Sequence, residues 1–468
     1  MQSLLTSIFL FTAYPLWSET FLRQDLAFLQ KSGCPIVGTS LYSGDCIPKD
    51  DWPKVRVLSS DVPPHSTLTR RRSIVGSMVR KAIPKRLYTS LSLHRHHAQV
   101  ERLESFVREI GATHIHAEFA DLAALVASEV ARRLNITYSI GIHAFDIHVS
   151  RFDLSDILCN ASAITVCNRA ALDACKRQFP QTDSLLHYIP HGVNLEFWTL
   201  RGEEQSPRIP FRGEEQSLTN ALLPLSTDKC IAQSANEKTP KGSNISNPRL
   251  SEAKPGGRMH PKDSDLEEVE PTLKENRTST ESLEILFVGR LVEKKGVRIL
   301  LEALAILQKR QNAPKCRLTI AGDGPLRDEL VQYTDELKIP ACCWAGVLSQ
   351  EALKLTMSSM SCLCAPSIVT KDGDRDGIPN VILEAMATGL PVIASLVGSI
   401  SEVITNDTGW PVADITPQTL AETIIEFANS TEIERKRRVV NARRLIEKSF
   451  DAQKLALERR KIFIHQQS

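Results

Sequence analysis

Two stretches of this chain, residues 1–198 and 283–435, alternate short apolar runs with amphipathic segments. In the first stretch, strand-like runs such as Ser3–Ala13 and Thr137–Ile142 are separated by segments with apolar residues at helical spacing, such as Leu122–Leu134. Strands that alternate with helices form parallel sheets whose two faces are covered by those helices. We therefore expect an α/β protein with two doubly wound, Rossmann-like domains that face each other across a cleft. Ligands bind such domains at the carboxyl ends of the strands.

The segment between these stretches, residues 199–282, differs in composition. It is rich in Ser, Glu, Lys, Pro and Asn, and Phe211 is its one aromatic residue. The hexapeptide RGEEQS occurs at Arg201 and again at Arg212. Such a segment buries too little apolar surface to offset the entropy of ordering it, so we expect a disordered insert. The tail over residues 436–468 is helical in pattern, and we expect it to cross back to the N-terminal domain.

Composition excludes several classes of protein. Lys and Arg number 57 and Asp and Glu 55, a formal net charge of +2, which gives no reason to expect nucleic acid as a partner. The apolar run Met1–Ala13 lacks the basic residues of a signal peptide and is too short to span a bilayer, so it predicts a buried strand. Eleven cysteines without zinc-ribbon spacing predict reduced thiols in a cytoplasmic protein.

The densest chemical pattern is DGDRDGIPNVILEAMATGLPVIAS, residues 372–395. Asp-Gly turns lead into a predicted helix with Pro379 at its first position and Gly389 as its stop. The free N–H groups at the start of that helix form a site suited to phosphate. Glu384, just over one turn into the helix, can accept two hydrogen bonds from a vicinal diol such as ribose. Asp376 precedes the helix, where it could meet a sugar ring.

A second pattern is FVGRLVEKKG, residues 287–296. A predicted strand ends in Gly289, and Arg290 and Lys295 follow in the loop. Two fixed cations at the carboxyl end of a strand can neutralise a diphosphate leaving group. A third pattern, IAGDGPLRDEL over residues 320–330, repeats the order of strand, glycine turn and helix.

Together these patterns resemble glycosyltransferase family 4, the retaining enzymes of the GT-B fold. That family carries GR-x4-KG, then AGDGP, then an E-x7-E element, matched here by Arg290 with Lys295, by Ala321–Pro325 and by Asp376 with Glu384. The sequence of residues 372–395 is most similar to members that build exopolysaccharide, such as the colanic acid and amylovoran transferases. Four N-terminal segments share this similarity: residues 14–26, 114–127, 138–148 and 189–198.

The resemblance implies a donor site in the second domain. Arg290 and Lys295 would hold the donor diphosphate, Glu384 would bind the ribose, and Asp376 would contact the donor sugar. The remaining donor-binding residues would act through their backbone: Gly289, Gly377, Ile378, Pro379 and Asn380.

The resemblance also implies roles in the first domain. His143 matches the family histidine that faces the donor sugar, so that His143, Asp376, Arg290 and Lys295 make up the expected catalytic set. Ser18 and Glu19 would lie near the acceptor. No cofactor and no metal ion is implied, because the cations and the helix start would stabilise the phosphates.

Alternatives remain at several of these positions. Residue 376 is Asp where the family has Glu, so its carboxylate is one methylene shorter, and Asp374 or a shifted loop might compensate. Asp376 could also be only a turn residue favoured before glycine, and His143 only a core histidine. The run Asp372–Gly377 imitates the start of a calcium loop, but Leu383 stands where that loop needs Glu.

A basic stretch suggests a membrane surface. Between Val62 and Val100 there are eight Lys or Arg residues, no acidic residue, and interleaved apolar residues. This stretch could lie on anionic lipid where a lipid-linked acceptor would be found, or it could be a solvated face.

The function that these patterns predict is transfer of a sugar, with retention, from a UDP- or GDP-sugar to a hydroxyl of a glycan or lipid-linked acceptor. The product would be an extracellular polysaccharide or a glycolipid, and the protein would be cytoplasmic, at the inner face of the membrane. The alternatives are a non-catalytic nucleotide-sugar-binding protein at the membrane, and an epimerase or phosphorylase of the GT-B fold.

Overall fold

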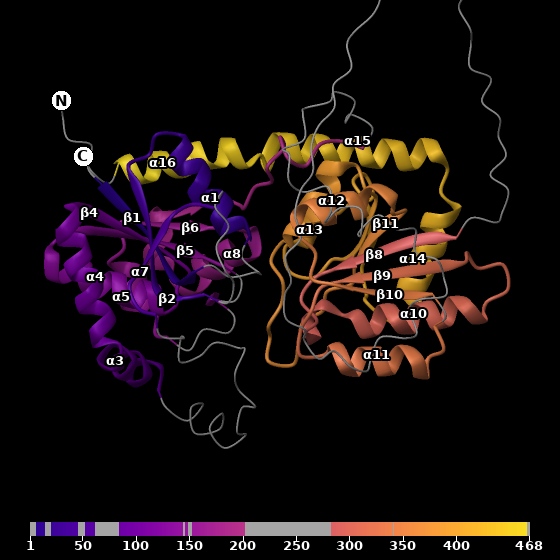
Figure 1. The fold of residues 1–468 in the computed structure, drawn as a ribbon, viewed down its shortest axis with the longest axis horizontal. Helices are drawn as coiled ribbons and strands as arrows, with labels where there is room; N and C mark the ends of the chain where they lie inside the picture. Colours follow the sequence, from indigo (N-terminus) through magenta and orange to yellow (C-terminus); the bar gives the residue numbers. More distant parts are fainter. Residues whose placement is uncertain are drawn as a thin grey trace, which may run out of the picture. The chain divides into compact units, whose positions relative to one another are not determined.

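The computed structural model describes residues 6–14, 20–44, 52–60, 84–143, 146–147, 152–201, 282–339 and 341–465. These residues form two parallel β-sheets, one of seven and one of six strands, each flanked by helices (Figure 1). The prediction of an α/β protein with two doubly wound domains is confirmed. The insert predicted over residues 199–282 lies outside the described residues except at 199–201 and 282.

The first sheet has the strand order β3-β2-β1-β4-β5-β6-β7. Its order reverses between β1 and β4, which creates a switch point at the carboxyl ends of the strands. The strands are β1 Thr6–Tyr14, β2 Ile36–Ser43, β3 Val55–Val57, β4 Ala112–Glu118, β5 Thr137–Ile142, β6 Ala163–Val166 and β7 Leu186–Tyr188.

Side chains of β1 alternate between two apolar clusters. Ile8 and Leu10 belong to the large cluster that also contains β4 and β5 residues, whereas Phe9 and Phe11 belong to a smaller one on the opposite face. The flanking helices are α1 Thr20–Lys31, α3 Lys85–Arg95, α4 His97–Ile110, α5 Leu122–Leu134, α7 Ser155–Cys159, α8 Arg169–Gln178 and the 3-10 helix η1 Pro180–Leu185.

The second sheet has the strand order β10-β9-β8-β11-β12-β13. Its strands are β8 Leu283–Val288, β9 Cys316–Ala321, β10 Cys342–Gly346, β11 Cys362–Ala365, β12 Val392–Ser395 and β13 Trp410–Val412. The accompanying helices are η2 Glu293–Lys295, α10 Val297–Lys309, α11 Arg327–Glu336, α12 Gln350–Ser359, α13 Asn380–Thr388, η3 Ile400–Glu402 and α14 Pro417–Asn429.

The start of α13 differs by one residue from the prediction. Pro379 has φ −62° and ψ 128°, so it is the extended N-cap residue and the helix begins at Asn380. Proline restricts the residue before it, here Ile378, to extended conformations, so the chain is not helical just before α13. Gly389 ends the helix in the left-handed region at φ 76°, as predicted.

The helical tail of the chain is broken into two helices, α15 Glu432–Ser449 and α16 Ala452–His465. The break lets Phe450 accept a hydrogen bond from Val193 N at 2.7 Å, while Ala452 N donates to Val193 O at 3.1 Å. After the break, α16 packs against α1 (Figure 1). Its Phe463 is fully buried in the cluster of Phe9 and Phe11. The last helix thereby completes the core of the first domain.

No helix among the described residues is long and apolar enough to cross a membrane.

Close packing of loops at the carboxyl ends of β8 and β11 depends on one glycine. Gly296 has φ 66°, and a Cβ built on it would lie 1.9 Å from the carbonyl oxygen of Pro366. Any side chain here must therefore push apart the loop that follows β8 and the loop that follows β11. Gly346, with φ 67°, has the same backbone conformation but no atom within 4 Å of the corresponding position.

We expect Gly296→Ala to lower the free energy of unfolding by about 3 kcal/mol, since it combines left-handed strain with a steric overlap. Gly346→Ala should cost only about 1 kcal/mol, because it introduces the strain alone. Urea unfolding of the wild type and both variants measures the difference. Equal losses in the two variants would show that the loops yield without cost.

Candidate functional site

Asp376 and Lys295 form an ion pair between the loop that follows β11 and the 3-10 helix that follows β8. Lys295 Nζ donates to Asp376 Oδ2 at 2.9 Å, and Ser367 Oγ donates to the same oxygen at 2.7 Å. Burial acts to raise the pKa of the Asp376 carboxyl, but Lys295 and Lys294 outweigh it and lower the pKa below its ordinary value. Asp376 is therefore a charged, almost fully buried group.

Glu384 projects from the second turn of α13 and is only 9% exposed. Burial raises the pKa of its carboxyl to about 7. Among the described residues, none donates a hydrogen bond to this carboxyl group. A buried carboxyl without a protein partner is costly unless a ligand supplies hydrogen bonds, and such groups gather at functional sites.

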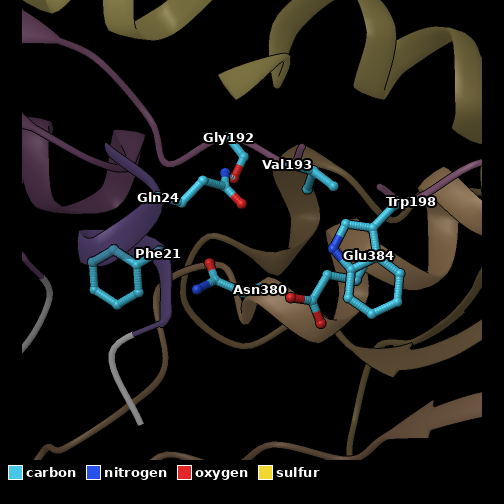
Figure 2. A pocket seen from close by; sticks show the side chains of 7 residues that line it. All are labelled: Phe21, Gln24, Gly192, Val193, Trp198, Asn380 and Glu384. Atoms are coloured by element: carbon cyan, nitrogen blue, oxygen red, sulfur yellow. Dashed lines mark hydrogen bonds between the residues drawn. The ribbon is translucent and has the colours of Figure 1, made fainter. Parts of the chain in front are cut away.

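A small pocket lies beside Glu384. Figure 2 shows Asn380 and Glu384 on α13, with Phe21 and Gln24 of α1 on the opposite side. Gln24 Nε2 donates to the carbonyl of Gly192 at 3.0 Å, which fixes one wall of the pocket. The complete lining is Phe21, Gln24, Gly192, Val193, Trp198, Asn380 and Glu384.

The other predicted donor residues lie around this arrangement. Ile378 lines a second cavity together with Cys167 and His191, and Pro379 is buried. Gly289 N donates to the carbonyl of Ala321 at 3.0 Å. Gly377 is half-buried between Asp376 and Ile378.

Arg290 stands apart from the other predicted cations. Its side chain is exposed and pairs with no acidic group among the described residues. The structure thus unites Lys295 with Asp376 and Asn380 with Glu384, and leaves Arg290 free. Ser18 and Glu19, predicted near the acceptor, lie outside the described residues.

His143 directly follows β5 and is buried at the carboxyl edge of the first sheet. Its Nε2 lies 2.8 Å from Glu118 Oε1, and its backbone N–H donates to Asp146 Oδ2 at 2.8 Å. Burial opposes the charged imidazolium, but Cys167 and Glu118 outweigh it and raise the pKa of His143 well above its ordinary value. His143 is therefore built into a polar network and is not an isolated core histidine.

That network continues along the strand ends. Glu118 Oε2 lies 2.9 Å from His116 Nε2, and His116 Nδ1 lies 2.8 Å from Ser139 Oγ. Gly141 leaves room for it, because a Cβ there would lie 2.9 Å from the Glu118 carboxylate. The carboxylate is thus held between two imidazoles inside the sheet.

Sequence reasoning did not single out Glu118, Cys167 or His191. Glu118 ends β4, Cys167 directly follows β6, and His191 lies in the loop after β7, at the edge where parallel strands place their ligands. That placement was the available signal: a polar residue at the end of β4, β6 and β7.

Residues 269–445 match the family model described as Glycosyl transferases group 1. This part of the chain is similar to the group 1 glycosyltransferase domain. It contains Lys295, Asp376, Asn380 and Glu384, so the pair and the unpartnered carboxyl described above lie inside the matched region. The predicted resemblance to glycosyltransferases is confirmed.

Curated relatives support the group 1 domain. The putative colanic acid biosynthesis glycosyltransferase WcaL of Escherichia coli is 33% identical over 178 residues, which cover 36% of this chain and 42% of WcaL. The amylovoran biosynthesis glycosyltransferase AmsK of Erwinia amylovora is 35% identical over 148 residues, 31% of this chain and 36% of AmsK. The chain thus matches less than half the length of these relatives.

The similarity to solved structures covers nearly the whole chain and not only the region that matches the group 1 model. Anabaena HepE in complex with UDP has a TM-score of 0.61 at 14% identity and covers 98% of this chain and 99% of its own. Sucrose-phosphate synthase from Thermosynechococcus elongatus has a TM-score of 0.62 at 17% identity, with 98% of both chains covered. At these identities the likeness shows the fold, which is the predicted GT-B fold.

Lys295→Met should lower the free energy of unfolding at pH 7 by about 3 kcal/mol, because it leaves the buried Asp376 carboxylate without its nearest cation. The lowered pKa of Asp376 stabilises the wild type above the ordinary carboxyl pKa, and this contribution is lost as the pH falls through the folded pKa. The difference between the two proteins should therefore shrink below about pH 4.

Urea unfolding at pH 7 and at acidic pH measures this effect. Lys294→Met is the matched control: Lys294 Nζ is 3.9 Å from Asp376 Oδ1, and its closer partner is Asp374 at 3.0 Å. It should therefore lose less stability. A loss in Lys295→Met that does not change with pH would contradict the ion pair.

Proposed function

We propose that this chain is a glycosyltransferase that moves a sugar from a UDP- or GDP-sugar to a hydroxyl of a glycan or lipid-linked acceptor. The observation that carries the proposal is Glu384, a buried carboxyl that accepts no hydrogen bond from the described residues, beside Asn380 at the start of α13 in the region that matches the group 1 model. A ribose diol would supply two hydroxyl donors to this group. That HepE is solved with UDP and with UDP-glucose supports a nucleotide-sugar donor.

In this proposal the donor diphosphate lies near the loop that follows β8. Lys295 and the free Arg290 would neutralise it, and the backbone N–H groups at the start of α13 would bind it as they bind anions at other helix starts. Gly289 and Gly377 would let the donor approach the backbone closely, alongside Ile378 and Pro379. No metal ion is needed for this neutralisation.

Asp376 would act on the donor sugar and His143 on its other side. The Lys295 ion pair holds Asp376 with Oδ2 occupied, so Oδ1 is its freer oxygen for a sugar hydroxyl. In the reaction, the bond between the anomeric carbon and the phosphate oxygen breaks and the acceptor oxygen bonds to that carbon. The acceptor proton passes to the leaving phosphate oxygen, and configuration is retained.

The biological setting is part of the same proposal. The names of WcaL and AmsK place those two proteins in colanic acid and amylovoran biosynthesis. We infer an acceptor of that general kind, in extracellular polysaccharide or glycolipid synthesis, and a protein that works in the cytoplasm at the inner face of the membrane.

One observation favours a second candidate, a non-catalytic nucleotide-sugar-binding protein. Asp376 is both shorter than glutamate and engaged by Lys295 and Ser367. If it cannot leave these partners, donor would bind without turnover. An epimerase or phosphorylase would instead isomerise the donor or release a sugar phosphate.

Release of UDP or GDP from a panel of nucleotide sugars, with membrane extract as acceptor source, tests the proposal. We expect one donor to be turned over, and Glu384→Ala to lower the rate at low donor concentration about 100-fold, the loss of two hydrogen bonds to a charged group. Glu422→Ala is the control, because Glu422 lies on the surface, where it pairs with Arg310.

Donor binding without release of nucleotide, across the panel, would support the non-catalytic candidate. In that case Asp376→Glu, which restores the longer side chain, is the variant to assay next. Full activity of Glu384→Ala would contradict the assigned ribose contact.

The membrane partner is proposed on helix α3, which lies within residues 84–100, the described part of the basic stretch. None of its residues is buried, and Leu87 and Leu91 are 53% and 51% exposed one turn apart on one face. Lys85, Arg86 and Arg95 give the helix positive charge without an acidic residue. Exposed leucines beside basic side chains suit an anionic lipid surface.

Leu87→Glu should therefore reduce co-sedimentation of the protein with anionic vesicles about 10-fold, since it replaces an apolar contact by a negative charge. Leu355→Glu is the matched control, an exposed leucine (44%) on α12. Neutral vesicles should bind neither variant nor wild type strongly. Equal sedimentation of the two variants would contradict a lipid contact at α3.

A further inference from the structure

Two histidine rings at the carboxyl edge of the first sheet point nitrogen atoms at each other. His143 Nδ1 lies 3.3 Å from His191 Nε2, and the rings are nearly parallel at 16° with centroids 4.9 Å apart. Neither nitrogen has a backbone partner among the described residues. The space between the rings is therefore defined by two imidazole nitrogens.

The opposite nitrogen of each ring is already committed to a carboxylate. His143 Nε2 lies 2.8 Å from Glu118 Oε1, and His191 Nδ1 lies 3.2 Å from Asp25 Oδ2. A carboxylate only accepts, so these two nitrogens carry the hydrogens. The two nitrogens that lie 3.3 Å apart can then share one proton or bind one metal ion.

Cys167 supplies a third donor atom to the same space. Its Sγ lies 3.7 Å from His143 Nδ1, and the three donor atoms lie within 4.8 Å of one another. A thiolate with two imidazole nitrogens is a donor set that suits zinc.

Two of the three separations between the donor atoms agree with a tetrahedral ion, and the third, from His191 Nε2 to Cys167 Sγ, is at most 4.8 Å. Bonds of about 2.05 Å to nitrogen and 2.3 Å to sulfur at tetrahedral angles separate two nitrogens by about 3.3 Å and a nitrogen from the sulfur by about 3.6 Å. The observed separations are 3.3 Å and 3.7 Å. An ion could thus be bound once the stacked rings turn so that both nitrogen lone pairs face it.

We propose that His143, Cys167 and His191 bind one Zn²⁺ ion, with a fourth position open for water. Cys167 and His191 also line the cavity that includes Ile378 and Phe450, about 20 Å³ in size and enough for the centre of one water molecule. The ion would be separate from the donor diphosphate, which needs no metal in the reaction proposed above.

The carboxylates that contact the two histidine rings suit a zinc site. Histidine ligands of zinc usually donate their second N–H to a carboxylate, which fixes the ring and raises its basicity. Both rings do so here, and both carboxylates are held in turn. Asp25 forms an ion pair with Arg459 of α16, and Glu118 contacts His116.

Binding is tested with Co²⁺, which takes zinc sites and gives a thiolate-to-metal charge-transfer band only if sulfur is a ligand. The full chain, stripped with a chelator, should take up one equivalent with this band, and Zn²⁺ should remove it. Cys167→Ser should abolish the band and weaken uptake at least about 100-fold. Cys159→Ser, at an exposed cysteine of α7, should behave as wild type.

Near-ultraviolet circular dichroism shows whether Cys167→Ser folds, and His191→Gln provides a second variant that should weaken uptake while keeping the sulfur. A protein that takes up no Co²⁺ would hold a proton between the rings, and the proposal would be overturned. A band that survives in Cys167→Ser would overturn it equally.

The effect on turnover rests on the proposed function. A zinc ion would occupy His143 Nδ1, so Zn²⁺ should inhibit sugar transfer by the wild type and a chelator should restore it. Cys167→Ser, compared with its own rate without zinc, should require about 100-fold more Zn²⁺. If no donor is turned over, the proposed function fails, while the Co²⁺ spectrum still decides whether the ion binds.

Discussion

The ion pair between Asp25 and Arg459 holds together the polar interior of the first domain. Both side chains are almost completely buried, and each would be costly to bury without the other. Asp25 orients His191. Burial opposes the charged form of Glu118, but hydrogen bonds with His116 and His143, together with the charge of Arg459, lower its pKa well below the ordinary value. The carboxyl edge of the first sheet therefore keeps its charges only while α16 remains packed against α1.

The second domain also contains buried carboxyl groups, but fewer charged groups surround them. Lys295 and Lys294 stabilise the charged form of Asp376. Glu384 has no such cation, so burial raises the pKa of its carboxyl. These two carboxyls, eight positions apart, thus have opposite electrostatic environments. One is kept charged without a ligand, and the other stays partly protonated near neutral pH until hydroxyl donors make its charged form favourable.

Elements with strong periodicity were predictable from the sequence. The helix Leu122–Leu134 and the strand Thr137–Ile142 have the predicted bounds, because apolar spacing and turn residues agree there. The strands β10 and β13 were not predicted. They are the two edge strands of the second sheet, and short edge strands with Gly or Pro carry little pattern.

The candidate site was predictable only in part. Motif spacing led to Lys295, Asp376 and Glu384, because their order along the chain is itself the signal. The ion pair of Lys295 with Asp376 and the network of His143 with Glu118, Cys167 and His191 depend on which strand ends lie side by side. The order of strands in the sheet determines which strand ends are neighbours. The sequence of a short strand does not reveal that order. The break at Phe450 was missed for the same reason, since it serves a contact with Val193 far away in sequence.

The position of α16 has a consequence for synthesis of the protein. Phe463 fills a cluster built from Phe9 and Phe11, and Arg459 pairs with Asp25 across 434 positions of sequence. The first strand and helix therefore complete their packing only after α16 has been made. The first sheet must keep an apolar face and a lone carboxylate open to solvent while the whole second domain emerges from the ribosome. Chaperones that shield nascent chains would find their binding surface on that face, and the second domain would fold before the first is finished.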